Sequence, residues 1–97
     1  LMKQIQRIQQ MEQLYDELKE ELASFEESYH KFQSMLPKFK ELSDYYTSAD
    51  WLKDVDDDSR GKFPQQLKRG VLSQDAIYLL LEETSDMIRT LQNTKLQ

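Results

Sequence analysis

An apolar stripe running from Ile8 to Phe39 constrains the fold of this chain more than any other feature. With Ile8 at heptad position a, large apolar residues fill every a and d position. The stripe consists of Ile8, Met11, Tyr15, Leu18, Leu22, Phe25, Tyr29, Phe32, Leu36 and Phe39. Alternate spacings of three and four residues place these side chains on one face of an α-helix. The pattern predicts a helix over residues 2–35.

Pro37 interrupts this helix without changing the phase of the stripe. Proline lacks a backbone N–H and biases the preceding residue away from helical angles. Because Leu36 and Phe39 keep the a and d positions, a helix is expected to continue over residues 37–46. The sequence leaves open whether the chain is kinked or broken at Pro37.

Residues 47–97 carry clearer start and stop signals. Ser73 is a good N-cap and Asp75 places negative charge in the first turn, which together predict a helix over residues 73–93. Residues 47–72 are predicted to form turns and short helices, with Ser48 capping a single turn before an acidic turn. The expected fold is all-α: one domain over residues 1–97, a helical hairpin or bundle whose C-terminal helix runs antiparallel to the long one.

Composition excludes several classes of partner and chemistry. The chain has no cysteine, which removes disulfides, thiolate metal sites and cysteine nucleophiles and fits a reducing, cytoplasmic location. Its net charge of −5 disfavours binding to nucleic acid or to anionic lipid. No apolar run approaches the roughly 20 residues that a membrane-spanning helix requires. We therefore expect neither a nucleic-acid nor a membrane partner.

Asp54, Asp56 and Asp58 alternate as the first ligands of a calcium loop would. An EF-hand loop also needs glycine at its sixth position and glutamate at its twelfth. Counted from Asp54, those positions hold Ser59 and Gln65. The three aspartates are therefore predicted to form a solvated acidic turn, with a weak cation cluster as the alternative.

No pattern in the chain indicates a catalytic centre. The one histidine, His30, takes a heptad b position, which points it away from the stripe. Two acidic pairs, Glu17 with Glu20 and Glu83 with Asp86, resemble magnesium-binding helices, yet their heptad positions face outward. No glycine-rich phosphate loop is present. We expect that the protein is not an enzyme and that it has neither a catalytic residue nor a cofactor.

Four aromatic residues crowd the middle of the chain. They are Tyr45, Tyr46, Trp51 and Phe63. Large aromatic side chains bury readily, so they are expected to form a small second core. The alternative is that some remain exposed as anchors for a partner, since tryptophan and tyrosine are enriched at binding hot spots.

The same middle segment resembles a family of small bacterial proteins known as domain of unknown function number 4298. The residues that carry the resemblance are Tyr45, Tyr46, Ser48, Trp51, Asp54, Gly61, Pro64, Leu67 to Ser73, Asp75, Ala76 and Tyr78. The earlier stretch "RIQQMEQLYDEL" is also similar to the family's opening helix. The resemblance implies a bacterial, all-helical protein and carries no activity, cofactor or catalytic residue.

The length of the stripe suggests what the protein does. At 1.5 Å per residue the first helix is about 50 Å long and the C-terminal helix about 30 Å. One returning helix cannot cover the whole stripe, so either the middle segment folds back over the remainder or a second copy of the chain covers it. We expect self-association as a homo-oligomer or binding to another protein. The alternative is a regulator that binds a small ligand or cation through Tyr46, Trp51 and the aspartates.

Overall fold

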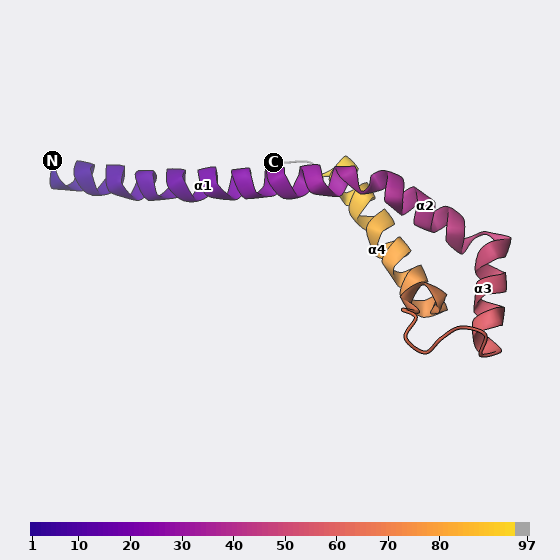
Figure 1. Ribbon diagram of the computed structural model, residues 1–97. Helices are drawn as coiled ribbons and strands as arrows, with labels where there is room; N and C mark the ends of the chain where they lie inside the picture. The colour runs from indigo at the N-terminus through magenta and orange to yellow at the C-terminus, as the bar shows by residue number, and fades with distance from the viewer. Residues whose placement is uncertain (95–97) are drawn as a thin grey trace. The chain divides into compact units, whose positions relative to one another are not determined.

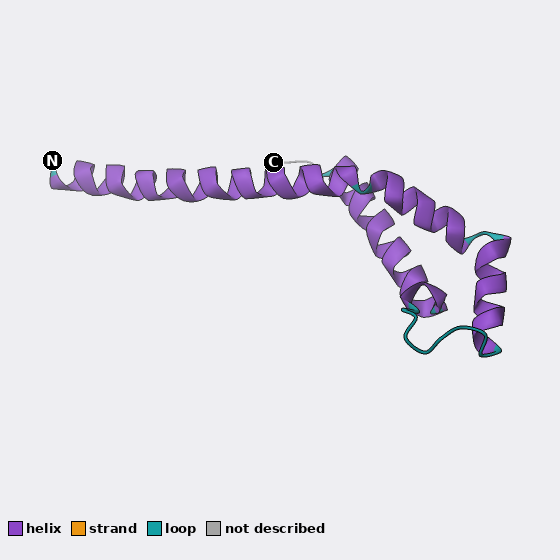
Figure 2. Ribbon diagram, viewed as in Figure 1, coloured by secondary structure: helices purple, strands orange, loops and turns teal. Residues whose placement is uncertain are grey.

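The computed structural model describes residues 1–94, and over those residues the chain is helical with no β-strand, as the sequence predicts (Figures 1 and 2). The helices in chain order are α1 (Met2–Ser34), α2 (Leu36–Tyr46), α3 (Ala49–Ser59), the single-turn 3-10 helix η1 (Gly70–Leu72) and α4 (Gln74–Asn93). The chain divides into a first unit, Leu1–Leu36, and a second unit that begins at Pro37. The antiparallel pairing of α4 with α1 stays a prediction, because these helices belong to different units.

The long predicted helix is broken just before Pro37. Helix α1 ends at Ser34, and Met35 turns out of the helix with its N–H donating to the Phe32 carbonyl at 3.0 Å. A proline at position 37 has no N–H to offer the carbonyl four residues earlier, and its ring would collide with that carbonyl. Proline is tolerated in the first turn of a helix, so α2 begins at once. Of the two possibilities at Pro37, the chain adopts the break.

Helix α3 is longer than the sequence predicts. Ser48 caps it as expected, with its hydroxyl accepting the Trp51 N–H at 3.3 Å. The helix then continues to Ser59 through every one of the aspartates that were predicted to form a turn. Aspartate favours turns and is unfavourable near the negative end of a helix. Its three last aspartates are each paired with a basic side chain, which offsets that cost.

The end of α3 is closed by Gly61. Its φ angle is +72°, in the left-handed region that only glycine enters at little cost. The Gly61 N–H donates to the Asp58 carbonyl at 3.0 Å, and the Lys62 N–H donates to the Asp57 carbonyl at 3.2 Å. These two bonds form a Schellman motif, which satisfies carbonyls that the helix would otherwise leave unpaired. A side chain at position 61 would strain this turn.

Helix α4 begins where the sequence predicts. The Ser73 hydroxyl accepts the Ala76 N–H at 3.3 Å, and the helix runs to Asn93. Ile77 is buried and Leu72, just before the cap, is half-buried, as a hydrophobic staple would require. Within residues 1–94 only Ile77 and Trp51 are buried, so the core of the second unit is small. No helix in that range is apolar over enough residues to cross a membrane.

Candidate functional site

The corner between α2 and α3 is held by Ser48. Its hydroxyl donates to the Tyr45 carbonyl at 2.6 Å while accepting the Trp51 N–H, so one side chain joins the end of α2 to the start of α3. Ser48 itself has an extended backbone (φ −94°, ψ 161°), which is the usual conformation of an N-cap. This corner sets the directions in which the middle aromatic residues point.

Trp51 ties α3 to the η1 turn. Its indole N–H donates to the Val71 carbonyl at 2.8 Å, across twenty residues of sequence. Its ring meets the Tyr46 ring edge-on, with centroids 4.9 Å apart and planes at 72°, a favourable arrangement for aromatic pairs. Trp51 is buried, and Tyr46 and Phe63 are half-buried. These contacts place Trp51 and Tyr46 in the packing of the second unit.

The fourth aromatic, Tyr45, bonds to an aspartate. Its phenol donates to the Asp54 carboxylate at 2.7 Å, linking the last turn of α2 to the middle of α3. This hydrogen bond, together with partial burial and the negative charge of Asp54, raises the pKa of Tyr45 from 10.0 to about 12. The phenol therefore stays protonated in the folded protein well above neutral pH.

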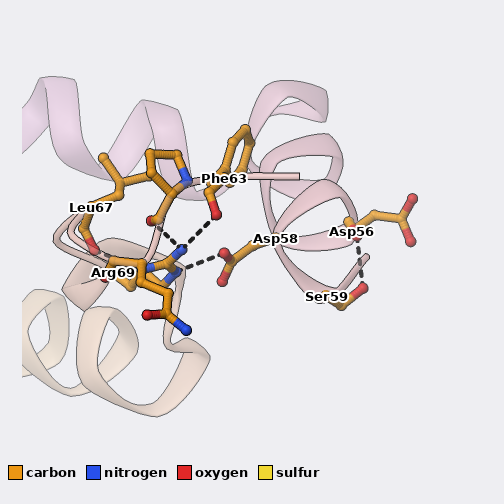
Figure 3. Close-up of polar contacts among 8 residues, drawn as sticks. Asp56, Asp58, Ser59, Phe63, Leu67 and Arg69 are labelled. Carbon is orange, nitrogen blue, oxygen red and sulfur yellow. Dashed lines mark hydrogen bonds and ion pairs between the residues drawn. The ribbon is translucent and has the colours of Figure 1, made fainter. Parts of the chain in front are cut away.

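Arg69 organises the loop that follows α3 (Figure 3). Its Nε donates to the Asp58 carboxylate at 2.7 Å. Its two terminal nitrogens donate to four loop carbonyls, those of Phe63 (3.3 Å), Pro64 (2.7 Å), Gln65 (3.1 Å) and Leu67 (2.8 Å). All five donors of the guanidinium are used in this way. One side chain thus provides hydrogen-bond donors to four carbonyl groups of a loop that has no secondary structure of its own, and it holds that loop against α3.

The three alternating aspartates do not converge on one point. Asp54 accepts from Tyr45, and Asp58 accepts from Arg69. Asp56 lies on another side of α3, extends away from Asp58 (Figure 3), and pairs with Arg60 at 3.2 Å. Over residues 1–94, no three histidine, aspartate or glutamate side chains gather closely enough to hold a metal ion. The alternation that suggested a calcium loop arises on a helix, where residues two apart face nearly opposite ways.

A shallow apolar groove lies in the second unit, and sequence reasoning missed it. Its volume is about 480 Å³, and its lining comes from α2, the η1 region and α4. The lining residues are Leu42, Lys68, Gly70, Val71, Ala76, Ile77 and Leu80. The small residues Gly70 and Ala76 leave the space open. The lining residues come together only in the fold, so they give no periodic signal in the sequence.

The apolar stripe on α1 is exposed in the first unit. No residue of α1 is buried. Leu18 is 71% exposed, and Leu22 and Phe25 are also more than half exposed. Single exposed apolar residues are common on protein surfaces, but a continuous row marks an interaction site. The stripe is therefore the leading candidate for a functional surface.

Comparison with known proteins identifies the family that the resemblance indicated. The sequence model of the family described as "Domain of unknown function (DUF4298)" matches residues 8–93. The chain belongs to this family. The DUF4298 region takes in α1 from Ile8 onward, the Arg69 loop and α4, so both candidate surfaces lie inside it. No curated protein and no solved structure matches the chain.

The Tyr45 hydrogen bond gives a prediction about alkaline pH. Tyr45→Phe should lower the free energy of unfolding by about 1 kcal/mol at neutral pH, the usual net value of such a bond. Since the folded pKa lies above the unfolded one, this contribution is complete below pH 10 and disappears as pH rises to about 12. Urea unfolding of the two proteins across that range measures the difference. A gap that stays constant would contradict the assignment.

Proposed function

We propose that this protein is a non-enzymatic interaction module that acts through the apolar stripe of α1, by self-association or by binding another protein. The observation that carries the proposal is the exposure of the stripe. From Ile8 to Phe25 its six members are each 52% exposed or more. A large apolar side chain contributes roughly 1.5–3 kcal/mol when it is fully buried, so covering this row is strongly favourable.

The stability of α1 itself supports the same proposal. Helices in proteins owe most of their stability to packing of an apolar face, and isolated ones are marginal in water. Helix α1 has 33 residues and none of them is buried. Its polar face offers little compensation, since its Lys31–Glu27 pair is solvent-exposed, and such pairs contribute a few tenths of a kcal/mol. A partner that covers the stripe would supply the apolar packing that the helix lacks.

The alternative function, a small-ligand or cation site in the middle segment, has less support. The polar groups that such a site would use already have partners within the chain. The indole N–H of Trp51 donates to the Val71 carbonyl. Asp54 accepts from Tyr45, and Asp58 accepts from Arg69. A ligand at these residues would first have to break bonds that hold the second unit together.

Dilution tests the proposal on the unmodified protein. If association stabilises α1, helicity measured by far-ultraviolet circular dichroism should fall as the protein is diluted from high to low micromolar concentration. The fluorescence of Trp51, the single tryptophan, should stay constant, because it reports the core of the second unit. Helicity that is independent of concentration, in a protein that light scattering shows to be a single chain, would overturn self-association as the function.

A further inference from the structure

The flanks of the stripe carry charges that have no partner within the helix. Heptad positions e and g border the stripe, and charged residues at these positions determine which helix pairs with it and in which orientation. Glu12 and Lys19 both take e positions and are exposed. Among residues 1–94 neither forms an ion pair, whereas Glu27 and Lys31, on the outward face, pair at 3.2 Å. The Lys19 ammonium leans back to within 5.9 Å of the centre of the Tyr15 ring, beside the stripe.

These flanking charges can be compared in each way that two copies of α1 could pair. In a parallel, in-register pair, g of one helix meets the following e of the other. Arg7 would then meet Glu12, but Glu21 would meet Glu26, and this repulsion occurs twice. Like charges placed in direct contact are destabilising by about as much as opposite charges stabilise. A parallel dimer therefore gains nothing from its flanks.

Antiparallel pairing has several registers, one heptad apart. In an antiparallel pair, position a faces d, and the flanking positions meet their own kind, e with e and g with g. If Ile8 faces Phe32, then Glu12 meets Glu26 and each copy's Lys19 meets the other's. If Ile8 faces Leu18, then Glu12 of the two copies meet each other, which offsets part of the attraction between Arg7 and Glu21 on the other flank. Both registers contain like-charge contacts.

The intermediate register, in which Ile8 faces Phe25, contains no like-charge contact on its flanks. Glu12 of each copy meets Lys19 of the other, so the favourable pair occurs twice. Gln4, a polar residue at position d, falls opposite the phenol of Tyr29 and so also has a polar partner. The overlap extends over residues 1–32, nearly the whole of α1. The remaining layers pair apolar residues: Met11 with Leu22 and Tyr15 with Leu18.

We propose that α1 pairs antiparallel with α1 of a second copy of this chain, with the two-fold axis between residues 16 and 17 and with Glu12 of each copy against Lys19 of the other. This inference rests on the proposed function and names the partner and its geometry. The dimer is isologous and closed, because each copy uses the same surface. Its charged flanks are solvent-exposed, so added salt should weaken it modestly through screening.

Charge exchange at these two positions tests the geometry. Glu12→Lys places four lysines in two repulsive pairs, and Lys19→Glu does the same with glutamates. Each single variant should weaken self-association by about tenfold, measured by sedimentation velocity, since attraction is lost and repulsion gained at two sites. An equimolar mixture of the two single variants should restore association to within about twofold of the unmodified chain. In the mixed dimer one copy has lysine at both positions and the other has glutamate at both, so the two contacts are again attractive.

The mixture separates this geometry from the others. In a parallel pair Lys19 would face Leu14 and not Glu12, so Lys19→Glu alone would leave association unchanged, and mixing would have no such loss to restore. Glu20→Lys, at an outward f position, is the control and should leave association unchanged. If the unmodified chain associates but mixing restores nothing, the antiparallel register is wrong while the proposed function stands. If the unmodified chain does not associate at all, the dimer and self-association are both wrong, and only binding to another protein is left of the proposed function.

Discussion

Replacing Arg69 with methionine should destabilise the second unit by about 3 kcal/mol, because a part-buried carboxylate and four carbonyls lose their donor together. Arg69 and Asp58 are only 32% and 23% exposed, so water replaces the lost contacts incompletely. Methionine keeps the length and apolar stem of the side chain, so the loss falls mainly on the guanidinium. Urea unfolding followed by Trp51 fluorescence gives the change in free energy.

Two further variants show whether the loss of stability comes from the N–H donors of the guanidinium. Arg69→Lys keeps the charge but cannot reach Asp58 and four carbonyls at once, so it should recover less than half of the loss. Arg60→Met removes an arginine from an exposed pair with Asp56 and should cost at most about 0.5 kcal/mol. Equal costs for Arg69→Met and Arg60→Met would show that Arg69 does not organise the loop.

Charges placed in the stripe of α1 should abolish association. The double variant Leu18→Glu, Leu22→Glu puts one carboxylate into each of the four central layers of the proposed dimer. Burying even one unpaired charge costs several kcal/mol, so association should weaken by more than about a hundredfold. Sedimentation velocity measures this loss. Trp51 fluorescence should remain that of the unmodified protein, because the second unit has a core of its own.

A matched control lies on the opposite face of the same helix. Gln6→Glu with Gln10→Glu adds the same charges at the same four-residue spacing, at outward positions f and c. Any general effect of negative charge on α1 acts equally in the two double variants, but only one of them alters the stripe. If the control weakens association as much as the stripe variant, the stripe is not the interface.

Local signals in the sequence predicted much of the fold. The heptad stripe predicted α1, and Ser48 and Ser73 predicted the starts of α3 and α4, because an N-cap acts on N–H groups within three residues of itself. The stripe, the leading candidate surface, was predicted for the same reason. Pro37 correctly marked an interruption, and the break at Met35 follows from the hydrogen bond that proline cannot make.

The full length of α3 and the role of Arg69 could not be predicted in this way. A run of aspartates by itself favours a turn. What extends the helix is its set of basic partners, among them Arg69, eleven residues beyond Asp58. Nothing periodic connects those two positions, so the pairing emerges only when the loop is folded. The hydrogen bond from Trp51 to Val71 is non-local in the same sense, and for that reason the aromatic residues could be listed but not placed.

The central claim is that a second copy of this chain covers the stripe of α1. Sedimentation equilibrium of the unmodified chain tests it most directly. The chain has a mass of 11.6 kDa. We predict that the weight-average mass rises with protein concentration toward twice that value and fits a monomer–dimer equilibrium. A mass that stays at that of a single chain over the whole concentration range, while circular dichroism shows α1 to be helical, would contradict the claim.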